Sequence, residues 1–66
     1  GGPLPTVFNA ANELAGSRFL NGESAYLTIP DMIEGAMNAH KKIADPTVEE
    51  ILQTEKETYE YIESRW

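Results

Sequence analysis

Apolar residues in this chain recur every three or four positions in three separate stretches, which is the spacing of one face of an α-helix. No stretch shows the alternation of apolar and polar residues that is typical of a half-buried strand. Gly22 and Asp45-Pro46 separate the stretches, because glycine ends helices and a residue before proline is biased away from helix. The pattern predicts an all-α fold, a small three-helix bundle, with helices at about 5–20, 29–41 and 48–64.

The same spacing predicts which residues face the core. The expected faces are Leu4, Val7, Phe8, Ala11, Leu14, Ala15 and Phe19 in the first helix, Ile29, Met32, Ile33, Ala36 and Met37 in the second, and Val48, Ile51, Leu52, Tyr59, Ile62 and Trp66 in the third. Thr28 is expected to cap the second helix by accepting a backbone amide bond. Thr47 and Glu50 have the spacing of a capping box at the start of the third.

A chain of 66 residues makes a marginal domain, because a domain of about 60 residues buries only about 60% of the surface that its unfolded form exposes. The sequence has no cysteine for a disulfide and no Cys/His cluster for a structural zinc. We therefore expect its support to come from good helix packing, self-association or docking onto further chain.

The charge balance is acidic, with 11 Asp and Glu against 5 Lys and Arg and a net charge of -6. Such a surface repels phosphate backbones and anionic headgroups, so roles on nucleic acid, including helix-turn-helix DNA binding, and on membrane surfaces are disfavoured. No apolar run approaches the roughly 18 residues of a membrane span. A soluble protein in the cytoplasm is the expectation.

The sequence offers no recognisable catalytic, cofactor-binding or metal-binding residues. His40 is the only histidine, and beside Lys41 and Lys42 at a helix end it is typical of a surface group that interacts with the helix dipole. None of the serines has a histidine partner at a recognisable spacing, and no glycine-rich phosphate loop is present. The glutamates of the third helix are expected to form a solvated face, with a surface for a metal or a basic partner as the alternative.

One polar stripe in the first helix stands out. Asn9, Asn12, Glu13 and Gly16 are spaced by three or four residues or lie side by side, so they share a side of the helix roughly opposite the apolar face. Asparagine is a mediocre helix former, so helix propensity does not explain two of them within one turn. The stripe is either an exposed polar face or a hydrogen-bonding surface for another part of the protein.

The residues around this stripe resemble the start of the C-terminal helical domain of the 1-deoxy-D-xylulose 5-phosphate reductoisomerase family. The resemblance rests on Gly1-Gly2, the prolines after it, Asn9-Ala10-Ala11-Asn12-Glu13, Leu14-Ala15, Phe19-Leu20 and Gly22, with a later Pro46-Thr47-Val48-Glu49-Glu50-Ile51-Leu52 segment. The Asn-Ala-Ala-Asn-Glu run is its specific part. The resemblance covers essentially the whole chain and implies that Gly1-Gly2 is family sequence and that the chain is a terminal fragment.

What the resemblance implies is a parent enzyme that converts 1-deoxy-D-xylulose 5-phosphate to 2-C-methyl-D-erythritol 4-phosphate in non-mevalonate isoprenoid biosynthesis. That enzyme uses NADPH and a divalent metal, Mg or Mn, and is expected to be a homodimer. Its catalytic and NADPH-binding domains precede the helical domain, so this fragment alone is expected to be inactive and to bind no cofactor. The implied partner is the catalytic domain of the same polypeptide, and Asn9, Asn12 and Glu13 are the candidate interdomain contacts.

Two positions depart from the family pattern. Gly16 stands where the family usually has a larger aliphatic residue, which leaves a gap and costs roughly 0.5 to 1 kcal/mol relative to alanine. Glu55 and Tyr59 stand where the family often has an acidic residue followed one turn later by arginine, so the corresponding ion pair is in doubt.

The alternative is a free-standing acidic interaction module that resembles a carrier protein. Such carriers attach a phosphopantetheine arm to a serine, normally in Asp-Ser-Leu at the start of a helix. This chain offers only Glu23-Ser24-Ala25, which falls in an expected linker.

Overall fold

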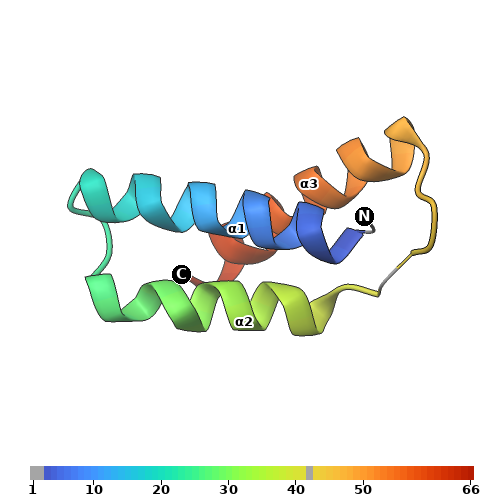
Figure 1. Ribbon diagram of the computed structural model, residues 1–66. Coiled ribbons are helices and arrows are strands. Elements are labelled where there is room, and N and C mark those ends of the chain that lie inside the picture. The colour runs from blue at the N-terminus through green and yellow to red at the C-terminus, as the bar shows by residue number, and fades with distance from the viewer. Residues whose placement is uncertain (1–2, 42) are drawn as a thin grey trace.

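The computed structural model describes residues 3–41 and 43–66, so the expectations for Gly1-Gly2 and Lys42 lie outside the described residues. The side chain of Leu4 is not described either, so its predicted place in the core stays a prediction. Three α-helices and one short 3-10 turn follow each other along the chain (Figure 1): α1 Pro3–Leu20, η1 Tyr26–Thr28, α2 Ile29–Ala39 and α3 Val48–Arg65. No strand occurs in these two described ranges, and the predicted all-α, three-helix fold is confirmed.

The helix bounds differ slightly from the expected ones. α1 begins at Pro3, two residues early, and α2 ends at Ala39, two residues early, with His40 as its C-cap. His40 has an extended backbone, and its Nδ1 lies 2.7 Å from the carbonyl oxygen of Ala36. The histidine side chain therefore contacts a carbonyl oxygen at the end of α2, where carbonyl groups lack partners within the helix.

Helix α1 is the centre of the bundle. It packs against both α2 and α3, whereas α2 and α3 contact each other much less. Figure 1 shows α1 and α2 side by side and running in opposite directions, as the short linker predicts. None of the described helices is both long enough and apolar enough to cross a bilayer.

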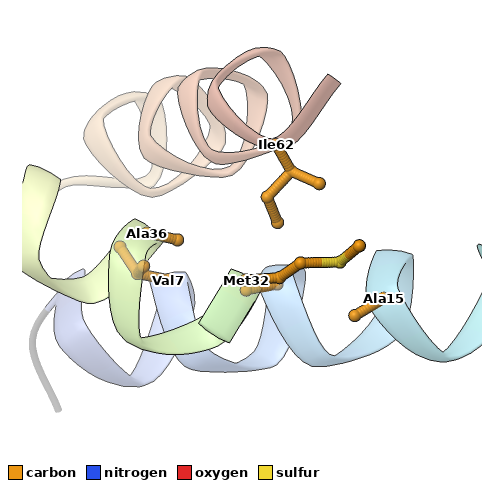
Figure 2. Packing of buried hydrophobic residues seen from close by; sticks show 6 residues of the cluster. Val7, Ala15, Met32, Ala36 and Ile62 are labelled. Carbon is orange, nitrogen blue, oxygen red and sulfur yellow. The ribbon is translucent and has the colours of Figure 1, made fainter. Parts of the chain in front are cut away.

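The core forms where the three helices meet. Its buried members are Val7, Ala11 and Ala15 from α1, Met32 and Ala36 from α2, and Ile62 from α3. Figure 2 shows the Ile62 side chain pointing from α3 toward Met32 and α1. Leu14, Ile29, Ile33, Met37 and Tyr61 are partly buried and pack against this cluster. The predicted face of α2 is thus confirmed, and that of α1 is confirmed at Val7, Ala11, Leu14 and Ala15.

The two phenylalanines of α1 were predicted to face the core, and this was wrong. Phe8 is 45% exposed and Phe19 is 39% exposed. Phe19 packs its ring against Tyr26, edge to face at 5.3 Å, and so covers the loop instead of the core. Periodicity identified the apolar side of α1. However, α2 and α3 bury only the central line of that side, at Val7, Ala11 and Ala15, and leave the two phenylalanines at its margin.

The predicted face of α3 was also wrong, except at Ile62 and the partly buried Tyr59. Its buried residues are Thr54, Thr58 and Ile62, four apart, whereas Val48 and Leu52 are 72% and 59% exposed. The buried Thr58 hydroxyl donates to the Thr54 carbonyl at 2.8 Å, so a polar residue occupies a core position without an unpaired hydroxyl. Ile51 and Trp66, also predicted to be buried, are exposed.

The capping predictions for α2 and α3 had opposite outcomes. The capping box is confirmed: the Glu50 amide donates to Thr47 Oγ1 at 3.1 Å, and the Thr47 amide donates to Glu50 Oε1 at 2.9 Å. Thr28 makes no cap bond and instead donates its hydroxyl to the Ala25 carbonyl at 2.6 Å. Because η1 leads directly into α2, Thr28 has a helical backbone and lacks the extended conformation of an N-cap.

Gly22 ends α1 as predicted. It has a φ of 73°, its amide donates to the Phe19 carbonyl at 3.0 Å, and the Glu23 amide donates to the Arg18 carbonyl at 2.8 Å. This pair of bonds is the Schellman motif, which requires a left-handed residue that only glycine adopts at little cost.

Gly35 lets α2 approach α3 closely. A Cβ atom built at Gly35 would lie 2.7 Å from Oη of Tyr61 and 3.5 Å from two carbons of its ring. The Tyr61 ring has contacts on two sides: the Arg65 guanidinium lies 4.3 Å from its centroid, and the His40 ring packs edge-on with the two centroids 6.3 Å apart. A methyl group at position 35 therefore requires the Tyr61 hydroxyl to shift, which would disturb these two contacts.

We predict that Gly35→Ala makes the chain less stable than the matched variant Gly16→Ala by about 1–3 kcal/mol, the usual cost of overpacking. Gly16→Ala meets nothing within 4 Å and should stabilise α1 by about 0.5–1 kcal/mol. The measurement is urea unfolding followed by far-ultraviolet circular dichroism.

In a Tyr61→Phe background the clash is gone, since the remaining 3.5 Å contacts are ordinary van der Waals distances. There Gly35→Ala should become as favourable as Gly16→Ala. Equal effects of Gly35→Ala with and without the Tyr61 hydroxyl would show that this contact is not what restricts position 35.

Candidate functional site

The polar stripe predicted on α1 is open surface. Asn9, Asn12 and Glu13 are exposed, on the side of the helix away from the buried Val7, Ala11 and Ala15. No hydrogen bond between described residues uses the Asn9 or Asn12 carboxamide. Gly16 continues the stripe, with open space where its side chain would be. These amides are free to bind groups outside the described chain.

Glu13 is placed differently from the two asparagines, because it borders α3. It lines a groove of about 320 Å³ with Leu14 and Ser17 of α1 and with Tyr59 and Glu63 of α3. The stripe therefore has two parts: Asn9 and Asn12 face outward, and Glu13 lies at the groove between α1 and α3. Sequence spacing grouped the three residues but did not indicate that Tyr59 lies next to Glu13.

Tyr59 is the side chain in this groove whose ionisation the structure changes. Partial burial raises its pKa above the ordinary 10.0, and the negative charges of Glu13 and Glu55 raise it further, because both factors disfavour the phenolate. Tyr59 is thus a neutral hydrogen-bond donor beside carboxylates, and it is poorly suited to act as a base.

We predict that Glu13→Gln lowers the pKa of Tyr59 toward its ordinary value, because it removes one of the nearby negative charges. NMR titration of ring-labelled tyrosine, with Tyr26→Phe and Tyr61→Phe to simplify assignment, measures it. Glu49→Gln, at the far end of α3, is the matched control and should leave the titration unchanged.

Because the pKa of Tyr59 is raised by folding, the free energy of unfolding must depend on pH in the alkaline range. Below pH 10 the phenol is protonated in both states, and above it the unfolded chain ionises first, so stability falls as the pH rises through the folded pKa. Tyr59→Phe should reduce this alkaline loss. A Tyr59 titration that is the same with and without the Glu13 charge would contradict the assignment.

No catalytic arrangement connects the serines with the histidine. Ser64 donates to the Tyr61 carbonyl at 2.9 Å, Ser17 lines the α1–α3 groove, and His40 is bonded to α2. Within residues 3–41 and 43–66, no three His, Cys, Asp or Glu side chains are grouped to hold a metal ion.

Ser24 bears directly on the carrier-protein alternative. Its hydroxyl oxygen is buried and makes no hydrogen bond in the described structure. A serine that carries a phosphopantetheine arm must present its hydroxyl to a transferase, and this one is turned inward. The structure therefore argues against that reading of Glu23-Ser24-Ala25.

A second groove lies on the other flank of α1, where it meets α2. We call it the α1–α2 groove; it has a volume of about 490 Å³ and is lined by Phe8, Ile29, Pro30, Ile33, Glu34, Met37 and Asn38. Helical periodicity did not indicate this groove, because it places Phe8, Ile29, Ile33 and Met37 in the core. The exposed Phe8 ring is the signal that only the structure provides.

Comparison with known proteins decides the family. The model of the DXP reductoisomerase C-terminal domain family matches residues 1–61 of the chain. The chain belongs to this family. The resemblance predicted from the Asn-Ala-Ala-Asn-Glu run is thereby confirmed, and so is the helical character of this reductoisomerase domain.

Curated relatives agree with the DXP reductoisomerase assignment. The 1-deoxy-D-xylulose 5-phosphate reductoisomerase of Lachnospira eligens is 56% identical over 66 residues, which are all of this chain and 17% of that protein. The enzyme of the same name from Agathobacter rectalis is 52% identical over 66 residues, with the same two shares. That of Listeria monocytogenes is 48% identical over 64 residues, 97% of this chain and 17% of the relative. No solved structure matches the chain with statistical significance.

Proposed function

We propose that this chain acts as the structural C-terminal domain of an enzyme that converts 1-deoxy-D-xylulose 5-phosphate to 2-C-methyl-D-erythritol 4-phosphate in non-mevalonate isoprenoid biosynthesis. The observation that carries the proposal is the match of the family model over residues 1–61. The chain spans only 17% of the length of these relatives. We therefore assign the enzyme's chemistry to the remaining part of the polypeptide. We also propose that this enzyme is a homodimer and lies in the cytoplasm.

The cofactors of that enzyme do not fit the residues present. NADPH needs a phosphate-binding site, and a divalent metal, Mg or Mn, needs grouped oxygen ligands. The described residues bring no such acidic or histidine group together. In the proposal the rest of the polypeptide holds both, and this domain contributes to folding and positioning only.

The polar stripe is the proposed brace against the catalytic domain of the same polypeptide. Asn9 and Asn12 are exposed and unbonded among the described residues, and each offers two donors and an acceptor. Two asparagines weaken α1 as a helix, which is consistent with a role that needs their amides. Glu13, held beside Tyr59, adds an acceptor at the edge of the stripe.

We predict that replacing Asn9 and Asn12 together by Ala in the full enzyme lowers both turnover and melting temperature. Each lost partner would leave a polar group of the catalytic domain unsatisfied, at a cost of about 1–3 kcal/mol. Asn21→Ala, at the exposed end of α1, is the matched control and should change neither quantity. Unchanged turnover and unchanged melting temperature in the double variant would remove the brace from the proposal.

The isolated 66-residue chain is predicted to consume no NADPH with the sugar phosphate, with or without Mn²⁺ or Mg²⁺. The reason is that its described residues contain neither a metal cluster nor a nucleophile paired with a base. NADPH absorbance gives the rate, and the full enzyme at equal concentration is the positive control. Metal-dependent turnover by the isolated chain would show that the chemistry has been assigned to the wrong part of the protein.

A further inference from the structure

We propose that one face of α3 is the docking surface for a patch of apolar and positively charged side chains on the catalytic domain of the same polypeptide. We call it the outer face of α3 and define it by Val48, Leu52, Glu55, Tyr59, Glu63 and Trp66. The inference rests on the proposed function and deepens it, because it adds an apolar and charged contact to the polar stripe of α1.

The outer face runs along the whole of α3. Its members follow one another by three or four residues, which places them on one side of the helix. The buried residues Thr54, Thr58 and Ile62 form a separate row. Tyr61, which approaches Gly35 of α2, lies on yet another side of the helix. The bundle therefore uses one row of α3 and leaves the outer face open.

The apolar side chains of the outer face lie on a well-formed helix. Val48, Leu52 and Trp66 are all exposed. The capping box of Thr47 and Glu50 satisfies backbone amides in the first turn, so Val48 and Leu52 are held in a helical arrangement. Covering these side chains removes apolar area from water, which is the main favourable contribution to protein association.

Carboxylates flank the middle of the outer face. Glu55 and Glu63 each lie four residues from Tyr59, and Glu13 of α1 adds a third carboxylate across the α1–α3 groove. Partial burial and the charges of Glu13 and Glu55 raise the pKa of Tyr59, so the phenol stays neutral and balances none of this charge. A surface that binds here therefore needs positive charge as well as apolar side chains.

The charge disfavours a second copy of this chain as the occupant. Two identical outer faces packed together would bring carboxylates against carboxylates, in a domain whose net charge is -6. A basic and apolar surface must come from a different sequence. In the proposed enzyme that sequence is the rest of the polypeptide, since this chain covers only 17% of the relatives' length.

The position of the outer face suits a domain that precedes α1. Figure 1 shows the beginning of α1 and the first turns of α3 at the same end of the bundle. A domain connected to the beginning of α1 therefore joins the bundle at the end where Val48 and Leu52 are exposed. The covalent connection raises its local concentration, so a contact of moderate size suffices.

The first test measures whether the outer face is covered in the unmodified full-length protein. Hydroxyl-radical oxidation of Leu52 is quantified by peptide mass spectrometry and divided by its rate in urea-unfolded protein. A side chain that stays 59% exposed would react at more than half of the unfolded rate. We expect about a tenth of that rate or less, as for the buried centre of an interface. A rate that matches the 59% exposure overturns the proposal.

The second test identifies the occupant and keeps an aromatic ring in place. Tyr59 is replaced by p-benzoylphenylalanine in full-length protein assembled from nitrogen-15-labelled and unlabelled subunits. Illumination should join position 59 to a peptide of the catalytic domain that carries the same isotope label. A crosslink between labelled and unlabelled peptides, or no crosslink outside these 66 residues, overturns the proposal.

The third test concerns charge. Glu55→Gln combined with Glu63→Gln should lower the melting temperature of the full-length protein by about 2–4 °C, because positive charges of the catalytic domain lose their partners. Glu57→Gln combined with Glu60→Gln removes the same charge from other sides of α3 and is the matched control, which should not lower it. Without a basic partner, neutralising carboxylates in an acidic domain relieves repulsion. An unchanged or raised melting temperature of the first variant therefore overturns the proposal.

Failure of the proposed function would appear separately, as absent reductoisomerase turnover in the unmodified full-length protein.

Discussion

The structure depends on the small residues along one side of α1. Ala11 and Ala15 on α1 and Ala36 on α2 bring the two backbones close enough for Met32 to fill the space between them, and Ile62 closes the cluster from α3. Since α2 and α3 touch each other only slightly, each is held mainly through α1. A larger side chain at Ala11 or Ala15 would therefore disturb both interfaces at once.

Local sequence signals predicted the helices well because they act within a few residues. The Thr47–Glu50 capping box and the left-handed Gly22 each satisfy backbone groups of a single turn, so no distant residue decides them. Thr28 shows the limit of this reasoning. Its residue type suits an N-cap, but the preceding 3-10 turn gives it a helical backbone and directs its hydroxyl to Ala25.

Burial was predicted less well, because it depends on where neighbouring helices end. α3 meets α1 at Thr54, Thr58 and Ile62, and its apolar start at Val48 and Leu52 stays in solvent. Hydrophobicity alone does not predict threonines in the core. Thr58 can be buried because its hydroxyl donates to the Thr54 carbonyl oxygen. Of the candidate site, the spacing predicted the grouping of Asn9, Asn12 and Glu13, whereas the proximity of Glu13 to Tyr59 and the groove at Phe8 arise only from packing.

The close approach at Gly35 links the histories of two positions on different helices. With tyrosine at position 61, a side chain at position 35 collides with its hydroxyl, while phenylalanine would leave room for a methyl group. A lineage can therefore lose the Tyr61 hydroxyl first and then gain alanine at position 35, whereas the reverse order passes through a strained intermediate. In this chain, the residue at position 61 thus limits which substitutions are accessible at position 35.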